Sequence, residues 1–495
     1  MTFRPVLAAI LVSLTLPATA AGQDRTASDY ISAIEGVQET DGPNDLGRLT
    51  IDGLLEEFGV PGVSVAVIHD FQVHWAKGYG VRDVETGEPV DTETMFQAAS
   101  ISKPVTAMAV LEAVEDGLFT LDTDINDILT SWTLDGGGFT DERPVTPRTL
   151  HSHTSGLGDG FGYPGYDPGD PIPTVVQMLN GEEPSNTRAV FMEREPMTFA
   201  EYSGGGVTVM QLALADARGR PFEEIMREDV LEPIGMTRSS FKQPISPEND
   251  RNAARAHDGQ GRSRGAKWHV YPEMAAAGLW TTATDLARFA IEVQKSSVGE
   301  SNRVLSRTTV QEMLSPVGVG DFAVGFVVGH EGEGWYFSHG GGNWGFRCTL
   351  VAHKVKGYGL AIMTNADRGG AVMGEIARRV RNAYEWDWDS EGVPRGYDPI
   401  PEREEIEVSE EILETYVGVY ELGDDGLQLT VSLEDGLLQL QPDGQQSLTL
   451  HAETEERFFM RTASALITFT KDDAGEVTGM MIAQGGGNSV ARKVR

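Results

Sequence analysis

A serine and a lysine three residues apart, Ser100 and Lys103, have the clearest potential for chemistry in this chain. A hydroxyl is a poor nucleophile at neutral pH and needs a base within hydrogen-bond reach. Residues three apart share one face of a helix, so Lys103 can supply that base. The apolar run from Val105 to Val114 predicts a buried helix, and Pro104 suits its first turn. We therefore expect Ser100 at a helix N-terminus, where the dipole favours a developing alkoxide.

Two further motifs follow in the chain, Tyr202-Ser203-Gly204 and His339-Gly340-Gly341. With Ser100-Ile101-Ser102-Lys103 they make the chain resemble the serine β-lactamase and penicillin-binding protein superfamily. Within it, the chain looks most like the class C β-lactamase-related hydrolases, which include esterases, D-aminopeptidases and D-Ala-D-Ala carboxypeptidases. Three other stretches fit the same family: Leu150–Leu157, Leu231–Thr237 and Gly278–Ala287. The resemblance covers residues 30 to 385.

The resemblance implies a role for each motif residue. Ser100 would attack an ester or amide carbonyl and form an acyl-enzyme, with Lys103 taking or sharing its proton. Tyr202 would lie against both and act as general base, although the residues leave open which of Lys103 and Tyr202 is the base. The backbone N–H groups of Ser100 and Gly342 would hold the oxyanion. No metal or organic cofactor is implied.

Substrate-binding contacts are expected from His339, Gly341 and Ser203, and two positions depart from the β-lactamase pattern. Where that pattern has a lysine, His339 is charged only below about pH 6.5 if unperturbed. Where it has an asparagine, Gly204 has no side chain. Both changes favour an ester or a peptide with D-residues over a β-lactam.

Two neighbouring segments are harder to interpret. His151 and His153 form an HxH pair, but Ser155 stands where a metallo-hydrolase would have an aspartate, so zinc is not expected. We interpret that stretch as a turn near the site. Residues 156–175 are rich in Gly and Pro and carry Phe161, Tyr163 and Tyr166. This loop is either a flap over the substrate or a passive surface excursion.

The length of 495 residues predicts more than one domain. Residues 30–385 are expected to form an α+β domain, an antiparallel sheet flanked by helices plus an all-α subdomain. The composition of residues 386–409 indicates a linker. Residues 410–495 show short strands separated by turns and resemble a lipocalin-like all-β barrel. The strands are expected at 428–432, 437–441, 448–452, 457–460 and 465–471.

The first 20 residues resemble a secretion signal, with Arg4 before an apolar stretch and Ala18-Thr19-Ala20 as the cleavage site. The mature protein is then expected in the periplasm or outside the cell, without a membrane anchor. Cys348 is the one cysteine of the chain and is interpreted as a buried structural thiol.

Three functional classes remain open from the sequence. The favoured one is a secreted serine hydrolase acting on a small molecule or a peptide. The second is a penicillin-binding or ligand-sensing protein that is acylated without turnover. The third is a non-catalytic protein that binds through its C-terminal barrel, which the trio of Ser100, Lys103 and Tyr202 disfavours. The oligomeric state cannot be inferred from the sequence.

The formal net charge of −36 argues against nucleic acid or an anionic membrane as a partner. A well-solvated acidic surface explains this charge simply, and adaptation to a salty environment is a sharper hypothesis. Under that hypothesis, raising the salt to about 1 M screens carboxylate repulsion and raises the thermal unfolding midpoint. Thermal melting with and without salt tests this, and an unchanged or lower midpoint would remove the hypothesis.

Overall fold

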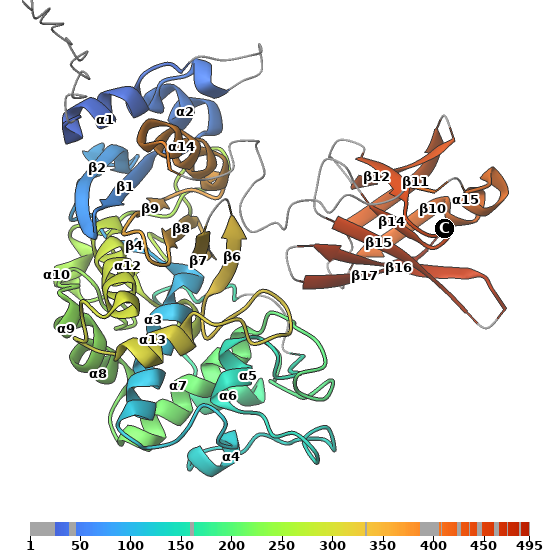
Figure 1. Ribbon diagram of the computed structural model, residues 1–495, viewed down its shortest axis with the longest axis horizontal. Coiled ribbons are helices and arrows are strands. Elements are labelled where there is room, and N and C mark those ends of the chain that lie inside the picture. Colours follow the sequence, from blue (N-terminus) through green and yellow to red (C-terminus); the bar gives the residue numbers. More distant parts are fainter. Residues whose placement is uncertain are drawn as a thin grey trace, which may run out of the picture.

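The computed structural model describes residues 25–38, 46–158, 163–331, 334–386, 405–406, 408–422, 427–434, 436–442, 448–459, 465–472, 474–484 and 487–494. They form a larger α+β unit and a closed β-barrel (Figure 1). The expected fold class is thereby confirmed. The proposed secretion signal, Phe161 and most of the proposed linker lie outside the described residues.

A seven-stranded antiparallel sheet forms the centre of the larger unit, with strand order β3-β2-β1-β9-β8-β7-β6. Its strands are β1 (Gly62–His69), β2 (Gln72–Asp83), β3 (Glu88–Pro89), β6 (Val327–Glu331), β7 (Gly334–Asn343), β8 (Phe346–His353) and β9 (Gly359–Thr364). A separate two-stranded ladder pairs β4 (Phe96–Gln97) with β5 (Trp280–Thr281). The pairing of β1 with β9 thus brings together two segments that lie about 300 residues apart in the chain.

A buried core lies on each face of the sheet, and side chains of the central strands alternate between the two cores. On β1, Val63, Val65 and Val67 pack into one core and Ala66 and Ile68 into another. The first core also takes side chains of α1 (Ala27–Glu35), α2 (Ile51–Phe58) and α14 (Gly369–Tyr384). The second takes those of α12 (Ala283–Val298) and extends into the helical subdomain.

The helical subdomain lies beyond one end of the sheet in Figure 1, with α3 running into it. Its long helices are α3 (Ser102–Glu115) and α7 (Gly204–Arg218). Shorter segments complete the larger unit: α4 (Ile125–Ile128), α5 (Pro147–His151), α6 (Val175–Asn180), α8 (Phe222–Ile225), η3 (Met226–Leu231), α9 (Glu232–Ile234), α10 (Pro247–Asp250), α11 (Met274–Ala277) and α13 (Arg307–Met313), with η1 (Leu46–Arg48) and η2 (Ala99–Ile101) as short turns. The segment α11 packs against both α3 and α7.

The C-terminal unit is a closed barrel of eight antiparallel strands. These are β10 (Gly418–Leu422), β11 (Leu427–Glu434), β12 (Leu437–Pro442), β13 (Leu448–Ala452), β14 (Arg457–Phe459), β15 (Ala465–Lys471), β16 (Val477–Gln484) and β17 (Gly487–Lys493), preceded by α15 (Glu410–Tyr416). Buried aromatic and aliphatic side chains, such as Tyr420, Phe458, Phe469 and Met480, form its core. In the described part of the barrel, the interior is therefore filled by side chains.

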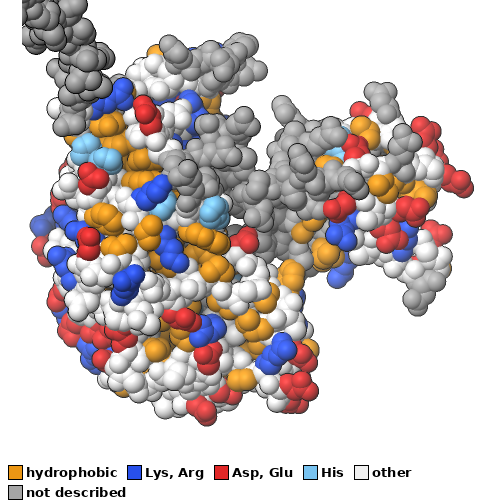
Figure 2. All heavy atoms as spheres, viewed as in Figure 1, with side chains coloured by type: hydrophobic (Ala, Val, Ile, Leu, Met, Phe, Trp, Pro, Cys, Tyr) orange, Lys and Arg blue, Asp and Glu red, His pale blue; other side chains and the backbone are white. Residues whose placement is uncertain are grey.

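None of the described helices is long and apolar enough to cross a membrane. On the face of the larger unit shown in Figure 2, Lys and Arg side chains lie interspersed among Asp and Glu side chains. Ion pairs are found among the described residues of the larger unit, such as Arg148 with Asp122 and Arg220 with Asp229. The acidic excess of the whole chain thus coexists with local charge pairing in the larger unit.

A fully buried arginine, Arg379 of α14, holds the N-terminal segments onto the larger unit. Its Nε donates to Glu375, at 2.7 Å. Its remaining bonds go to backbone carbonyls of Ile34, Gly36, Leu46 and Leu49, at 2.7 to 3.2 Å. The neighbouring Arg378 binds the same carboxylate but is 33% exposed.

Replacing Arg379 with Met leaves the Glu375 charge and four carbonyls with fewer partners in the interior. We expect a loss of about 3–5 kcal/mol in the free energy of unfolding, as for other broken buried ion pairs. The matched variant Arg378→Met should lose less than about 1 kcal/mol, because that pair is partly solvated. Equilibrium denaturation in urea measures both losses. Equal losses would contradict the role given to Arg379.

Candidate active site

Ser100 lies in a tight turn, η2, that leads directly into α3. Ala99 before it adopts a positive φ of 48°, which is uncommon for a residue with a side chain. Two contacts fix this turn: Ser102 Oγ donates to Ala99 O at 2.6 Å and accepts from Leu279 N at 3.0 Å. The buried Cys348 adds an Sγ contact to Ala98 O at 2.9 Å. The predicted N-terminal place of Ser100 is therefore observed, and Cys348 supports the turn.

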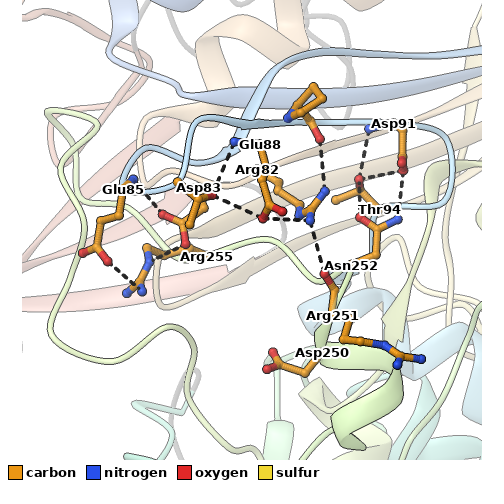
Figure 3. A network of polar contacts seen from close by, with 12 residues as sticks. Arg82, Asp83, Glu85, Glu88, Asp91, Thr94, Asp250, Arg251, Asn252 and Arg255 are labelled. Carbon is orange, nitrogen blue, oxygen red and sulfur yellow. Dashed lines mark hydrogen bonds and ion pairs between the residues drawn. The ribbon is translucent and has the colours of Figure 1, made fainter.

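The segment leading to Ser100 is tied to residues 250–255 by polar contacts (Figure 3). Asp91 accepts from the Asn252 amide at 3.0 Å and from Thr94 Oγ1 at 2.8 Å. Arg255 pairs with Asp83 at the end of β2, at 3.0 Å. Burial raises the pKa of Asp83, but the Glu85 N–H and the Arg255 guanidinium more than offset this and lower it. The network fixes the path of the chain toward the nucleophile.

Lys103 is 2% exposed and donates hydrogen bonds to two oxygen atoms. Its Nζ donates to Ser100 Oγ at 3.1 Å and to Ala276 O at 2.8 Å. The carbonyl of Ala276 belongs to α11. Gln211 of α7 holds this segment in place: its Nε2 donates to Pro272 O at 3.0 Å, and its Oε1 accepts from Ala275 N at 2.9 Å. The same short segment thus links the helix that follows Ser100 to the helix that follows Tyr202.

Tyr202 completes the group around Ser100. Its ring lies 4.8 Å from Lys103 Nζ, centroid to nitrogen. Burial of the hydroxyl raises the pKa of Tyr202 above its ordinary value, and a hydrogen bond with the Ser100 side chain offsets only part of this. At neutral pH Tyr202 is therefore a phenol that can give a proton. The structure brings Ser100, Lys103 and Tyr202 together, as the motifs predict.

His153 is a part of the site that sequence reasoning did not recognise. Its ring lies 4.3 Å from that of Tyr202, between centroids, and its Nδ1 accepts from Ser203 N at 3.1 Å. Burial and then the positive charge of Lys103 lower its pKa well below the ordinary value, so this imidazole is neutral. The HxH pair drew attention to the position, but the contact with Tyr202 links residues 49 apart and has no local signal.

His339 is also neutral. Its Nδ1 lies 2.6 Å from Gly340 O, and since a carbonyl only accepts, Nδ1 carries the hydrogen. Burial and the nearby charge of Lys103 lower the pKa of His339 to about 4. Its Nε2 is buried and has no hydrogen-bond partner among the described residues. His339 therefore offers a lone pair rather than the positive charge of a lysine.

The other predicted contacts lie close by. Ser203 caps α7, with Oγ accepting from Gly206 N at 2.8 Å, so its side chain has a structural task. A Cβ on Gly341 would come within 2.3 Å of Ala98 O and 2.4 Å of Cys348 Sγ, so only glycine lets β7 pass the Ser100 turn. Gly342 is the next residue of β7. Substrate contacts of Ser203 and Gly341 and the oxyanion role of Gly342 stay predictions.

Glu273 is a buried carboxyl that the sequence did not single out. It is fully buried at the start of α11, and neither carboxyl oxygen has a hydrogen-bond partner among the described residues. Burial raises its pKa to about 7. Burial raises the pKa values of Tyr166 and Tyr271, and the Glu273 carboxyl raises both further. Because burial disfavours the charged carboxylate, protonation of Glu273 favours the folded state.

Comparison with known proteins agrees with this geometry. The family model described as Beta-lactamase matches residues 48–385, and a domain of unknown function, DUF3471, matches residues 402–489. The chain belongs to the β-lactamase family, as its motifs predict.

Three curated relatives illustrate the range of that family. Protein Rv1367c of Mycobacterium tuberculosis is 31% identical over 261 residues, which cover 47% of this chain and 62% of that protein. Penicillin-binding protein 4* of Bacillus subtilis is 25% identical over 81% of this chain and 88% of its own length. Esterase EstB of Burkholderia gladioli is 30% identical over 42% of this chain and 53% of its own. The chain thus spans less than two thirds of the mycobacterial relative.

Solved structures support the fold. The crystal structure of SurE with D-Leu has a TM-score of 0.62 at 22% identity, and covers 90% of this chain and 97% of its own. The D-amino acid amidase of Ochrobactrum anthropi has a TM-score of 0.55 at 21% identity, with 72% and 98% covered. At these identities the similarity establishes the architecture alone.

Glu273→Gln tests the buried carboxyl through the pH dependence of stability. The unfolded carboxyl ionises near its ordinary pKa of 4.5, while the folded one keeps its proton up to about pH 7. Stability contributed by the protonated carboxyl is therefore lost between these values as pH rises, and levels off above them. The variant lacks this loss, so it should gain about 3 kcal/mol over the wild type on going from about pH 4 to about pH 8.

Urea denaturation at both pH values measures this difference between the proteins. The exposed variant Glu300→Gln is the control, since it removes a carboxyl from the surface. If the stability difference between Glu273→Gln and the wild type is the same at both pH values, hydrogen-bond partners must stabilise the Glu273 carboxylate in the folded protein.

Proposed function

We propose that the protein is a serine hydrolase that cleaves an ester or an amide through an acyl-enzyme on Ser100. The observation that carries the proposal is that two side chains, those of Lys103 and Tyr202, both bond to the side chain of Ser100. Lys103 Nζ lies 3.1 Å from Ser100 Oγ, and the Tyr202 hydroxyl bonds to the same side chain. A nucleophile with a base in hydrogen-bond reach is the arrangement that acyl transfer requires.

The chemistry needs one proton to move in each half-reaction. In the reactive form, the Lys103–Tyr202 pair holds one proton fewer than when both side chains are protonated. The pair takes the proton of Ser100 as Ser100 Oγ attacks the carbonyl carbon. The phenol of Tyr202 then gives a proton to the leaving group. Water then loses a proton to the same pair and attacks the acyl carbon, and Ser100 recovers its proton. The N–H groups of Ser100 and Gly342 would stabilise the oxyanion in both steps.

The neutral imidazole of His339 supports a substrate without a carboxylate at this position. A fixed cation would attract a carboxylate, whereas His339 presents an acceptor at neutral pH. We therefore favour a carboxylic ester, or an amide next to a D-residue, over a β-lactam. The secretion signal proposed for residues 1–20 would place the mature enzyme in the periplasm or outside the cell. No observation on the described part of the barrel favours it as the binding site, because its interior is filled.

The test combines covalent labelling with turnover. The wild type should gain one fluorophosphonate adduct in intact mass and hydrolyse p-nitrophenyl acetate. Ser100→Ala should gain no adduct and lose turnover by about 10³-fold or more, since removal of the nucleophile abolishes the covalent route. Circular dichroism should show that the variant is folded, since the substitution removes one hydroxyl from a residue that is only partly buried.

Two outcomes would argue against hydrolysis. An adduct on the variant would place the reactive serine elsewhere. Labelling of Ser100 without ester or amide turnover would favour a protein that is acylated and loses the acyl group only slowly. A mass spectrum of the lasting acyl adduct would identify such a protein.

A further inference from the structure

Gly204, two residues after Tyr202, is a glycine for reasons of space. A Cβ built on it would lie 2.7, 2.8 and 2.9 Å from three atoms of the Tyr163 phenol. Contacts below 3.0 Å require a neighbour to move, and here the neighbour is an aromatic ring. The ring of Tyr163 therefore occupies the place that a side chain at position 204 would take.

The ring is held in that place along the first turn of α7. The Tyr163 hydroxyl lies 3.1 Å from Thr208 Oγ1. Thr208 in turn donates to Gly204 O at 3.2 Å. Tyr163 is thus bound to the turn of helix that follows Tyr202 and does not merely overhang it.

The residues after Tyr163 are bound on the other side. His269 Nδ1 lies 2.8 Å from Pro164 O, so the imidazole donates to it. Tyr166 exchanges backbone hydrogen bonds with Val270 at 2.8 and 2.9 Å. The segment from Tyr163 to Tyr166 is therefore pinned at both ends, which distinguishes it from a passive surface excursion.

His269 connects this segment to the end of β7. Its ring stacks on Trp344 with centroids 3.9 Å apart and an interplanar angle of 9°. Trp344 N donates to the Tyr271 hydroxyl at 3.0 Å. Trp344 follows Asn343, the last residue of the strand that carries His339 and Gly342. The segment thus contacts the start of α7, two residues after Tyr202, and reaches through His269 the residue that follows β7.

We propose that Tyr163 is the specificity-determining residue of this site, a wall that limits the substrate to esters with a short apolar group beside Gly204. The inference rests on the proposed function and adds the substrate class to it. A planar ring without a charge offers an apolar surface, so a group that reaches it must be small and uncharged. Gly204 leaves the space that the ring of Tyr163 fills, so the two residues act as one unit.

The first test is a double-mutant cycle on this unit. Gly204→Ala should lower kcat/KM for p-nitrophenyl acetate by about tenfold or more, because one added methyl group forces the ring to move. Adding Tyr163→Ala removes the ring, so the double variant should return to within about threefold of Tyr163→Ala alone. Independent effects that multiply would overturn the proposal.

The second test measures substrate length and does not depend on whether Gly204→Ala folds. The wild type should lose kcat/KM steadily from p-nitrophenyl acetate to the hexanoate and octanoate, or from short to long alcohols in a series of acetates. Tyr163→Ala should gain about tenfold or more on the long members of one series relative to acetate. The two series show whether the acyl or the alcohol part meets the wall.

A matched control exists in the β1–β2 hairpin. Gly357 has the ring of Phe71 within 2.4 to 2.7 Å of its built Cβ, the same arrangement away from Ser100. Phe71→Ala should leave the length profile of both series as in the wild type. A Tyr163→Ala profile that also matches the wild type would overturn the wall.

The failures of the two proposals can be told apart. If the wild type takes no fluorophosphonate and hydrolyses no ester, the proposed hydrolase function fails. If it is labelled at Ser100 and hydrolyses acetate, but Tyr163→Ala changes neither length series, only the assignment of Tyr163 fails.

Discussion

The bond from Lys103 to Ala276 O is the interaction on which the rest of the site depends. A buried lysine needs acceptors for its hydrogens, and this carbonyl supplies one while directing the remaining donors at Ser100. The carbonyl is fixed because α11 is wedged between α3 and α7, the two helices that follow the first two motifs. Burial lowers the pKa of His153 and His339, and the nearby positive charge of Lys103 lowers both further, so both imidazoles are neutral. The contact with Ala276 O therefore fixes the place of the charge that reinforces the effect of burial.

This arrangement also explains why the third motif tolerates a histidine. Its imidazole lies in the field of a cation and away from water, and both conditions oppose protonation. A second lysine in its place would need to be charged beside Lys103. The site thus holds one cation, Lys103, beside neutral rings such as that of Tyr202. Chemistry in such a site depends on moving a proton along short distances rather than on attracting a charged substrate.

Local patterns predicted a large share of this structure. The apolar run after Pro104 became α3, and the spacing of Ser100 and Lys103 gave their contact, because both are properties of one helix. The strands β13 and β15 of the barrel have the predicted bounds, since their apolar residues alternate. In contrast, β17 is a polar segment that is a strand through its pairing with β16 and with β10, the second of which closes the barrel. The acceptor of Lys103, the neighbour of Tyr202 and the occupant of the space beside Gly204 all lie far away in the chain, and no local pattern encodes such contacts.

The packing of Tyr163 on Gly204 has a consequence for how members of this family can diverge. A lineage that gains a side chain at position 204 before losing the ring would pass through a damaged enzyme. Loss of the ring first leaves an open but working site, which a later side chain at 204 can line. The order of the two changes is therefore constrained, and the loop carrying Tyr163 must vary before the motif on α7 does. Short insertions and deletions in that loop would then be the entry point to new substrates, with the catalytic residues themselves unchanged.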